Sequence, residues 1–282
     1  MKLNNKSSQI FIPSGIKNEL ALSQTTHLAI AAHQDDIELM ALDGVLQCFA
    51  KSDKHFTGVV TADGAGSPRN GMYKDYSDND IKKVRIAEQK KAAVIGEYSA
   101  LVMLDYPSKE IKNSNNEKII DDYVEILSAT KPEYVYTHNL ADKHDTHVAV
   151  AVKVIKAIRK LNDSQKPKKV YGCEVWRDLD WVLDSQKILF DTSSHPNISN
   201  ALVEVFDSQI TGGKRYDLAA SGRRTAHATY GASHQVDNAN SVNYAIDLTP
   251  LVYDKTLDIK QYILQYIKAF ENDVIGKLNK LV

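Results

Sequence analysis

Two short segments of the chain concentrate the side chains that could bind a metal ion or transfer protons. The first, His33-Gln34-Asp35-Asp36-Ile37-Glu38, holds one imidazole and three carboxylates. The second, residues 138–147, holds three imidazoles and two carboxylates, contributed by His138, Asp142, His144, Asp145 and His147. Such a density of charge is costly to bury unless a cation or hydrogen bonds compensate it. Both segments are therefore candidates for a metal site.

Apolar runs and helical patterns alternate along the first half of the chain. Runs long enough for strands occupy residues 28–32, 56–61, 100–104, 134–137 and 170–176. Helical patterns lie between them, at residues 37–51, 81–96, 117–130 and 147–161. Nearly continuous apolar strands separated by helices are typical of a parallel sheet covered on both faces. The sequence therefore predicts a Rossmann-like, open and mostly parallel α/β sheet.

The alternation is less regular after residue 176. Helices are predicted at residues 197–210 and 214–229, a strand at 244–248, and a C-terminal helix from about Ile259. Arg223, Arg224 and His227 are predicted to lie on a solvated face of the second of these helices. We expect a single α/β domain over residues 1–282, with a core at about 24–176 and a C-terminal elaboration at about 177–282.

The two polar segments follow the first and fourth predicted strands. Open α/β sheets bind their ligands at the carboxyl ends of strands. If these two strands are neighbours, His33, Asp36 and His147 can converge although they are far apart in the sequence. Two imidazoles and one carboxylate leave one position of a tetrahedral zinc open, which is the arrangement of catalytic rather than structural sites.

Each of these residues also has a simpler interpretation when it is taken alone. A histidine at a strand end usually forms ordinary hydrogen bonds, and Asp35 or Asp36 could cap the following helix. Capping needs only one acid, however. It does not account for adjacent acids on one side of the crevice and a second pair of imidazoles, His144 and His147, on the other. Together the residues favour a metal site.

The motifs resemble those of a known family. Residues 33–38 are similar to the AHPDDxE signature of the PIG-L and LmbE-like deacetylases, zinc-dependent enzymes that remove acetyl groups from N-acetylglucosamine-type sugars. Residues 142–147 resemble the second motif of that family, D-R-H-P-D-H, and Arg85-Ile86-Ala87-Glu88 is similar to its R-x-x-E helix. Order and approximate spacing agree over residues 27–176.

This resemblance implies an LmbE-like deacetylase fold and a role for each matching residue. His33, Asp36 and His147 would hold one divalent metal ion, expected to be Zn²⁺. Asp35 would be the general base, and His144 would steady the oxyanion or protonate the leaving amine. Arg85 and Asp105, the acid after the third predicted strand, would face the sugar.

The chain departs from the family pattern at two places. Gln34 replaces the usual proline, which removes a restricted φ but no ligand. Asp145-Thr146 replaces Pro-Asp, so that an acid stands one position early and a supporting role behind the ligands is not assigned to it.

Composition excludes several classes of function. The chain has 35 basic and 36 acidic residues, so no broad positive field is available for nucleic acid. No window approaches the ~18 to 20 apolar residues of a membrane span. Residues 1–9 are polar and lack the apolar core of a secretory signal, and the only two cysteines, Cys48 and Cys173, lie in apolar patterns. We expect a cytoplasmic protein without a disulfide.

The residues and the family resemblance together predict a metal-dependent hydrolase, with zinc as the expected metal, that removes the N-acetyl group from an N-acetylglucosamine-type sugar or its conjugate and releases acetate. One alternative is a phosphoester hydrolase, for which two metal ions ~3.5 to 4 Å apart would be usual. Another is a non-catalytic sugar-binding module. The identity of the sugar and the formation of a homo-oligomer stay open.

Overall fold

The strands of the chain form one mixed sheet in the computed structural model, which describes residues 1–232 and 234–282. Among those residues eight strands follow the order β1-β4-β3-β2-β5-β6-β8-β7. The five central strands run parallel to one another: β2 (His27–Ala31), β3 (Phe56–Ala62), β4 (Ala100–Tyr106), β5 (Tyr134–His138) and β6 (Lys169–Cys173). The edge strand β1 (Gln9–Phe11) pairs antiparallel to β4, β8 (Val242–Asp247) pairs antiparallel to β6, and the other edge strand, β7 (Ile188–Asp191), pairs antiparallel to β8.

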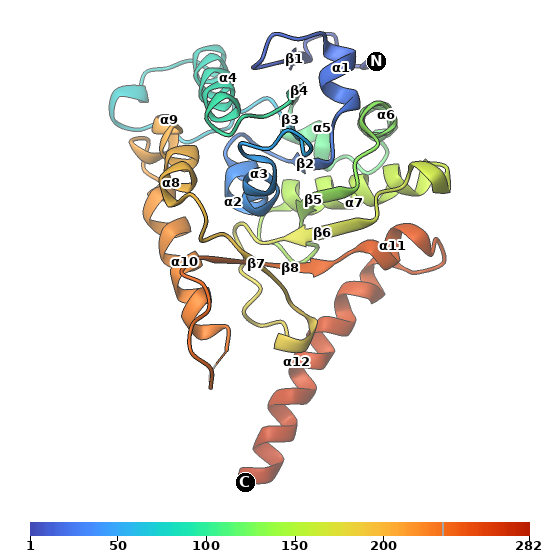
Figure 1. Cartoon of the computed structure of the whole chain (residues 1–282), viewed down its shortest axis with the longest axis vertical. Coiled ribbons are helices and arrows are strands. Elements are labelled where there is room, and N and C mark those ends of the chain that lie inside the picture. The colour runs from blue at the N-terminus through green and yellow to red at the C-terminus, as the bar shows by residue number, and fades with distance from the viewer. Residues whose placement is uncertain (233) are drawn as a thin grey trace.

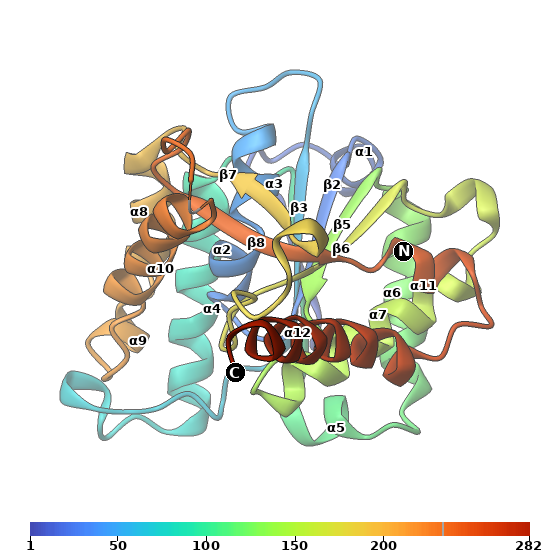
Figure 2. The same cartoon turned by 90° about the horizontal axis from the view of Figure 1, so that it is seen from below.

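Helices cover both faces of this sheet, as Figure 2 shows. One face packs against α1 (Asn18–Ser23), α5 (Ser108–Lys112), α6 (Glu117–Thr130), α7 (Asp145–Lys160), α11 (Thr249–Tyr253) and the start of α12 (Ile259–Leu281). The other packs against α2 (Asp36–Met40), α3 (Leu42–Cys48), α4 (Asp78–Ile95) and α8 (Pro196–Glu204). Successive residues of β2 serve the two layers in turn: Leu28 and Ile30 face the first, Ala29 and Ala31 the second.

The predicted fold class is confirmed, and the differences lie in short elements. The expected helix at residues 37–51 is divided into α2 and α3 at Ala41, and the one at 197–210 into α8 and α9 (Asp207–Ile210). The apolar spacing continues across such short breaks, so that periodicity cannot distinguish one helix from two. The edge strands β1 and β7, of three and four residues, were not predicted because so few residues carry no clear alternation.

The C-terminal part extends the same sheet and then leaves it. Residues 177–282 contribute β7 and β8, and α10 (Tyr216–Tyr230) packs against β8. In Figure 1, α12 runs away from the body toward the C-terminus. Cys48 and Cys173 are both buried free thiols, as predicted. Across the part of the chain that the structure describes, no helix has both the length and the apolar character that crossing a bilayer requires.

Candidate active site

The two polar segments meet at the carboxyl edge of the sheet. Strands β2 and β5 are direct neighbours, with His27 opposite Tyr134 and Ala29 opposite Tyr136, so that the turn after β2 faces the loop after β5. A hydrogen bond joins the two edges: the backbone N–H of Ala32 donates to His138 Nε2 over 2.9 Å. The adjacency on which the sequence argument depended is therefore present.

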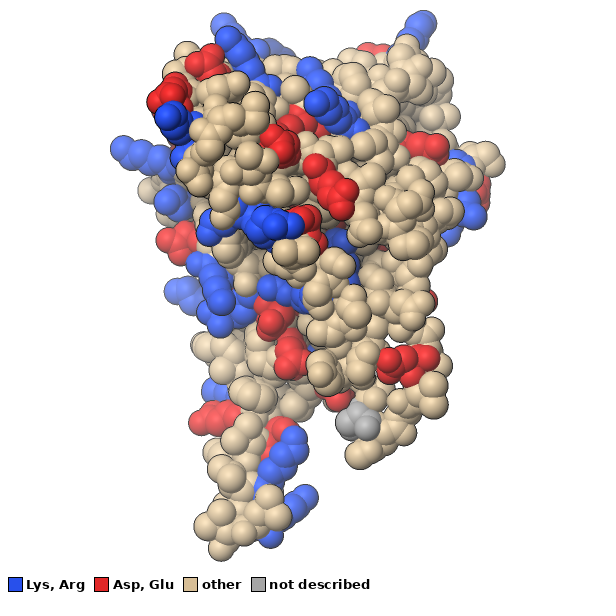
Figure 3. Space-filling view, turned by 90° about the vertical axis from the view of Figure 1, so that its left-hand side faces the viewer, with Lys and Arg blue, Asp and Glu red and all other residues tan. Residues whose placement is uncertain are grey.

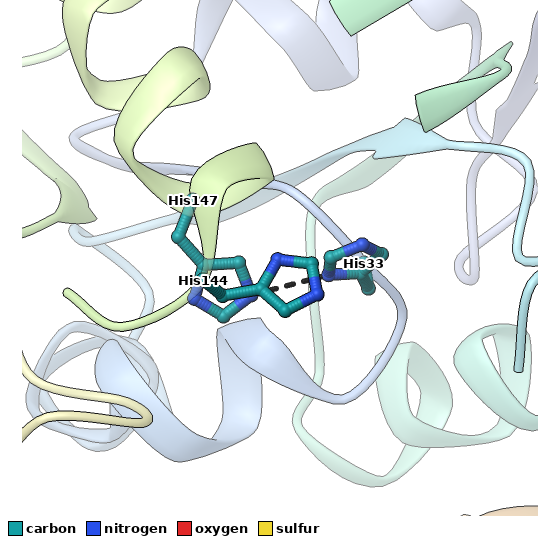
Figure 4. Close-up of side chains that lie close together, drawn as sticks. All are labelled: His33, His144 and His147. Atoms are coloured by element: carbon teal, nitrogen blue, oxygen red, sulfur yellow. Dashed lines mark hydrogen bonds between the residues drawn. The ribbon is translucent and has the colours of Figure 1, made fainter. Parts of the chain in front are cut away.

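Three side chains place one potential ligand atom each at nearly equal separations. His33 Nδ1 lies 3.2 Å from Asp36 Oδ2 and 3.2 Å from His147 Nε2, and the latter two atoms are 3.3 Å apart. Figure 4 shows His33 and His147 pointing toward each other, with His144 beside them. Ligands ~2.0 to 2.1 Å from a tetrahedral ion lie about 3.3 Å from one another. The spacing of these atoms fits one metal ion of that kind.

His138 and His144 border this triad. Two further groups of side chains have ligand atoms close enough together to hold an ion. One consists of Asp36, His138 and His147, and the other of His33, His144 and His147. His138 Nε2, however, already accepts the hydrogen bond from Ala32, and its ring stacks on His147 at 3.9 Å. The geometry thus favours His33, Asp36 and His147 as the ligand set, with His138 as a support for the His147 ring.

The carboxylates of Asp36 and Asp142 favour a positive charge at the triad. Burial opposes ionisation of Asp36, but the neighbouring His147 and His138 outweigh it and hold the pKa of Asp36 well below its usual value. Burial likewise opposes protonation of His147, yet Asp36 and Asp142 raise its pKa to about 9. A proton on His147 or a metal ion supplies the positive charge that the two carboxylates favour, which is the second reason why this donor set suits a cation.

Asp142 is a supporting residue that the sequence motif contained but to which no role was assigned. Its Oδ1 lies 3.4 Å from His147 Nδ1, on the side of the ring opposite the triad. It also accepts hydrogen bonds from the backbone N–H groups of His144 and Trp176, over 2.9 and 3.0 Å. A carboxylate behind a histidine ligand fixes the orientation of the ring and raises its basicity.

Replacement of Asp142 by Asn is therefore expected to weaken metal binding by about 10- to 100-fold. The amide keeps the size of the side chain but removes the charge that faces His147. Competition with a chromophoric chelator measures the affinity. Asp145→Asn, an exposed acid in the same loop, is the control and should leave the affinity unchanged. Equal affinities for the wild type and Asp142→Asn would show that Asp142 does not support the ligand.

Asp35 stands beside the triad in an unusual backbone conformation. Its φ is 80°, in the left-handed region that few residues other than glycine adopt, and its N–H donates to Gln89 Oε1 over 3.2 Å. Burial raises the pKa of Asp35 to about 6, although Arg85, whose guanidinium lies 3.2 Å from its carboxylate, lowers it. A carboxylate with a pKa in this range is suited to accept a proton near neutral pH.

Glu38, the third acid of the first segment, points away from the triad. Its carboxylate accepts hydrogen bonds from Gln89 Nε2 and from the Tyr98 hydroxyl, over 2.7 and 2.8 Å. Burial raises the pKa of Glu38 to about 7. Through Gln89 this buried network also holds the backbone of Asp35, so Glu38 has a structural part in the site that the sequence did not reveal.

The structure brings Arg85 into the site and leaves Asp105 outside its pocket. Arg85 is only 1% exposed and its guanidinium also bonds to the Gln34 carbonyl and lies over the Phe206 ring at 5.5 Å. Asp105, with a φ of 57°, lies 3.9 Å from Lys82 Nζ and does not contribute to the pocket lining. The predicted sugar contact of Asp105 stays a prediction.

A pocket of about 290 Å³ opens in front of the triad. His33, Asp35, Asp36 and His144 contribute to its lining, and so do Trp176, Tyr216, Lys214 and Lys112. Trp176 and Tyr216 meet edge to face at 6.0 Å, and Lys214 Nζ lies 5.1 Å from the centre of the Trp176 ring. None of the pocket residues Lys112, Trp176, Lys214 and Tyr216 belongs to a motif, so the sequence patterns did not indicate them.

Gly64 forms part of the same pocket, and a side chain at this position would be strained. Its φ is +76°, and a Cβ there would lie 2.8 Å from Gln34 Oε1 and 3.2 Å from the Arg85 Cβ. The glycine after β3 is therefore required by both its conformation and the close approach of α4.

The expected solvated face of α10 is wrong for two of its three residues. Arg224 is buried and donates to the backbone carbonyls of Glu38 and Leu39, over 2.8 and 3.2 Å. His227 is buried with its Nδ1 3.1 Å from Glu174. A charged side chain on a helix is solvated by default, and only the packing of α10 against β8 and the end of α2 provides these partners.

Solved structures share this fold at low sequence identity. An N,N'-diacetylchitobiose deacetylase from Pyrococcus horikoshii aligns with a TM-score of 0.66 and 12% identity, over 84% of this chain and 88% of that one. A teicoplanin deacetylase, described as a zinc-inhibited form, aligns with a TM-score of 0.56 and 15% identity, over 79% and 97%. The 4-carboxy-2-hydroxymuconate hydratase of Pseudomonas putida aligns with a TM-score of 0.58 and 16% identity, over 80% and 97%. At these identities the likeness shows the fold alone, which evidently serves more than one reaction.

A search of curated proteins found no match to the sequence. The model of the family described as PIG-L, GlcNAc-PI de-N-acetylase, matches residues 28–158, a segment that carries both polar motifs and the helix with Arg85. The core of the chain therefore matches the PIG-L family, as its motifs predicted.

Proposed function

We propose that this protein is a metal-dependent N-deacetylase that removes the acetyl group from an N-acetylglucosamine-type sugar or its conjugate and releases acetate. The observation that carries the proposal is the triad of His33, Asp36 and His147, whose ligand atoms lie 3.2 to 3.3 Å apart. Two of its members, His33 and Asp36, line a pocket together with Asp35. The description of the matching family and the deacetylases among the fold relatives support the reaction class.

The triad would hold one divalent ion, and its two nitrogen atoms and one oxygen atom suit Zn²⁺. When bound, such an ion would polarise the amide carbonyl and lower the pKa of a water molecule, so that the water loses a proton more readily as it attacks the carbonyl. Asp142 fixes the His147 ring from behind, and His33 is tied to Asp36 by the hydrogen bond that its own backbone N–H donates, over 2.7 Å.

In this proposal Asp35 transfers the protons and His144 donates a hydrogen bond to the oxyanion. Asp35 accepts the proton of the attacking water, and Arg85 beside it stabilises the carboxylate before the transfer. Burial, reinforced by His33 and His147, lowers the pKa of His144. His144 is therefore neutral near pH 7 and keeps one N–H, which can donate a hydrogen bond to the oxyanion. The proton that Asp35 has taken is then available for the leaving amine.

The substrate class depends on the pocket wall and on the family. Trp176 and Tyr216 offer apolar ring faces of the kind that pack against the C–H groups of a sugar, and Lys112 and Lys214 offer hydrogen-bond donors. The hydratase among the fold relatives shows that the fold alone does not determine the substrate. The amino sugar is therefore argued from the site and the family description together.

Release of acetate from a panel of N-acetylated sugars tests the proposal. Metal-loaded protein should release acetate from at least one N-acetylglucosamine derivative and should leave a free amine, detected in parallel. Hydrolysis of phosphomonoesters or phosphodiesters with two bound ions per chain would favour the phosphoester hydrolase. Saturable sugar binding without acetate would favour the sugar-binding module. Either result would contradict the deacetylase.

Alanine substitutions should distinguish the roles of Arg85 and Asp105, the two residues predicted to contact the sugar. Removal of Arg85 leaves Asp35 without its cation, and Arg85→Ala is expected to lower kcat/KM for the sugar by about tenfold to a hundredfold at unchanged metal content. Asp105→Ala should cause a loss of the same order only if Asp105 contacts the sugar. Steady-state kinetics and elemental analysis provide both readouts, and Asp145→Asn is again the control. No loss with Asp105→Ala would restrict sugar binding to the pocket lining.

A further inference from the structure

The C-terminal helix α12 presents an apolar stripe to solvent. Seven large apolar side chains of this helix, from Leu264 to Leu281, are between 39% and 84% exposed. Single exposed apolar residues are ordinary on a protein surface, but a contiguous group on one element marks an interaction site. In Figure 3 the projecting lower end of the molecule shows uncharged surface beside several charged groups.

Only the first turns of α12 are attached to the body. Tyr262 and Tyr266 are buried, and the Tyr262 hydroxyl donates to the Asp247 carbonyl over 2.6 Å. The whole of α12 lies within the described residues, and after Tyr266 none of its residues is buried. A helix without packing is only marginally stable in water, because most helical stability comes from burial of an apolar face. The projecting part of α12 therefore requires a partner.

The spacing of the apolar residues in the stripe is the same in both directions along the helix. Its central positions are Ile267, Phe270, Val274, Leu278 and Leu281. Successive members are three or four residues apart, so they share one face of the helix. Ile267 and Leu281 are equally distant from Val274, and so are Phe270 and Leu278. A face with this symmetry can be covered by an identical face that runs in the opposite direction.

We propose that α12 is a dimerisation helix, which pairs antiparallel with α12 of a second copy of this chain about a two-fold axis at Val274. In this register Ile267 lies opposite Leu281, Phe270 lies opposite Leu278, and Val274 meets its own counterpart. Every central position of the stripe is then covered by an apolar side chain. An isologous contact of this kind closes at two copies.

Charges beside the stripe agree with the antiparallel direction. Asp273 and Lys277 lie on one flank, where they form an ion pair within the helix at 2.6 Å. Antiparallel pairing about Val274 brings Lys277 of each copy within one turn of Asp273 of the other.

Sedimentation velocity of the full chain tests the association. The wild type should be dimeric, and Val274→Asp, which puts two carboxylates on the axis, should raise the dimer dissociation constant at least about tenfold. Asn272→Asp, on the outer face of the same helix, should remain dimeric. Far-UV circular dichroism and acetate release check that the folded body is intact. A monomeric wild type, or a monomer that sediments with phosphatidylcholine and phosphatidylserine vesicles, would overturn the proposal.

Disulfide trapping tests the register. Both natural cysteines are buried, so an introduced thiol on α12 is the reactive one. Under mild oxidation Val274→Cys should form a covalent dimer, and Asn272→Cys should not. Ile267→Cys alone should stay uncrosslinked but should crosslink when it is mixed with Leu281→Cys. Self-crosslinking of Ile267→Cys would indicate parallel helices and would overturn the proposed pairing. None of these positions is in the active site, so the outcome is independent of the proposed reaction.

Discussion

Chelation of the metal is expected to abolish N-deacetylase activity, and each of the substitutions His33→Ala, Asp36→Ala and His147→Ala is expected to reduce the metal content from about one ion per chain to near zero. The reason is the number of ligands. The triad offers three atoms at mutual distances of 3.2 to 3.3 Å, and with one of them removed the remaining two cannot complete a three-ligand site. Elemental analysis of purified, dialysed protein gives the stoichiometry directly.

His55→Ala is the matched control for this prediction. His55 precedes β3 and so lies at the amino edge of the parallel strands, opposite the site. This variant should retain metal and activity. Full metal content in all three ligand variants would show that the ion, if present, binds elsewhere. Two tightly bound ions per wild-type chain would instead support the phosphoester hydrolase.

The core of this site could be predicted because local sequence carries most of it. Each polar segment lies at the carboxyl end of a short strand whose residues are buried except for Tyr134, and the carboxyl edge of a parallel sheet is where such segments meet. What the sequence did not contain was the order of the strands. The pairing of β2 with β5, on which the convergence of His33 with His147 depends, is a non-local property that the motif resemblance supported indirectly.

The supporting residues were harder to predict because their partners come from distant elements. Gln89 was one of many polar residues on α4, yet it holds the backbone of Asp35 and bonds to Glu38. Arg224 was expected in solvent because the backbone carbonyls that it binds, in α2, are 185 and 186 positions away in the sequence. Periodicity reports which face of a helix is polar but not whether another element satisfies that polarity.

The backbone around Asp105 departs from the strand pattern, while its predicted contact with the sugar stays a prediction. The residue was placed at the sheet edge because it ends an apolar strand pattern. In the structure the pairing of β3 with β4 shifts between Val60 and Ala62, and Asp105 itself adopts a φ of 57°. An irregularity of this kind changes the direction of the side chains at the strand end, and the sequence pattern does not report it.

Replacement of Asp35 by Asn should keep the metal and slow the chemical step by roughly 10² to 10⁴. Asparagine has the shape of aspartate and tolerates the left-handed conformation at φ 80°, so the hydrogen bond from this backbone to Gln89 is expected to persist. Only the proton acceptor is lost. Arg85 loses its nearest charge but still has the Gln34 carbonyl and the Glu88 carboxylate as partners.

Single-turnover kinetics with metal-loaded protein measure this step without the contribution of product release. Asp145→Asn, an exposed acid at the start of α7, is the control and should turn over at the wild-type rate. His144→Ala should resemble Asp35→Asn, with metal retained and a slower chemical step, because the oxyanion loses a hydrogen-bond donor. If Asp35→Asn instead loses the ion and regains normal turnover when metal is restored, then Asp35 is a ligand and another group accepts the proton.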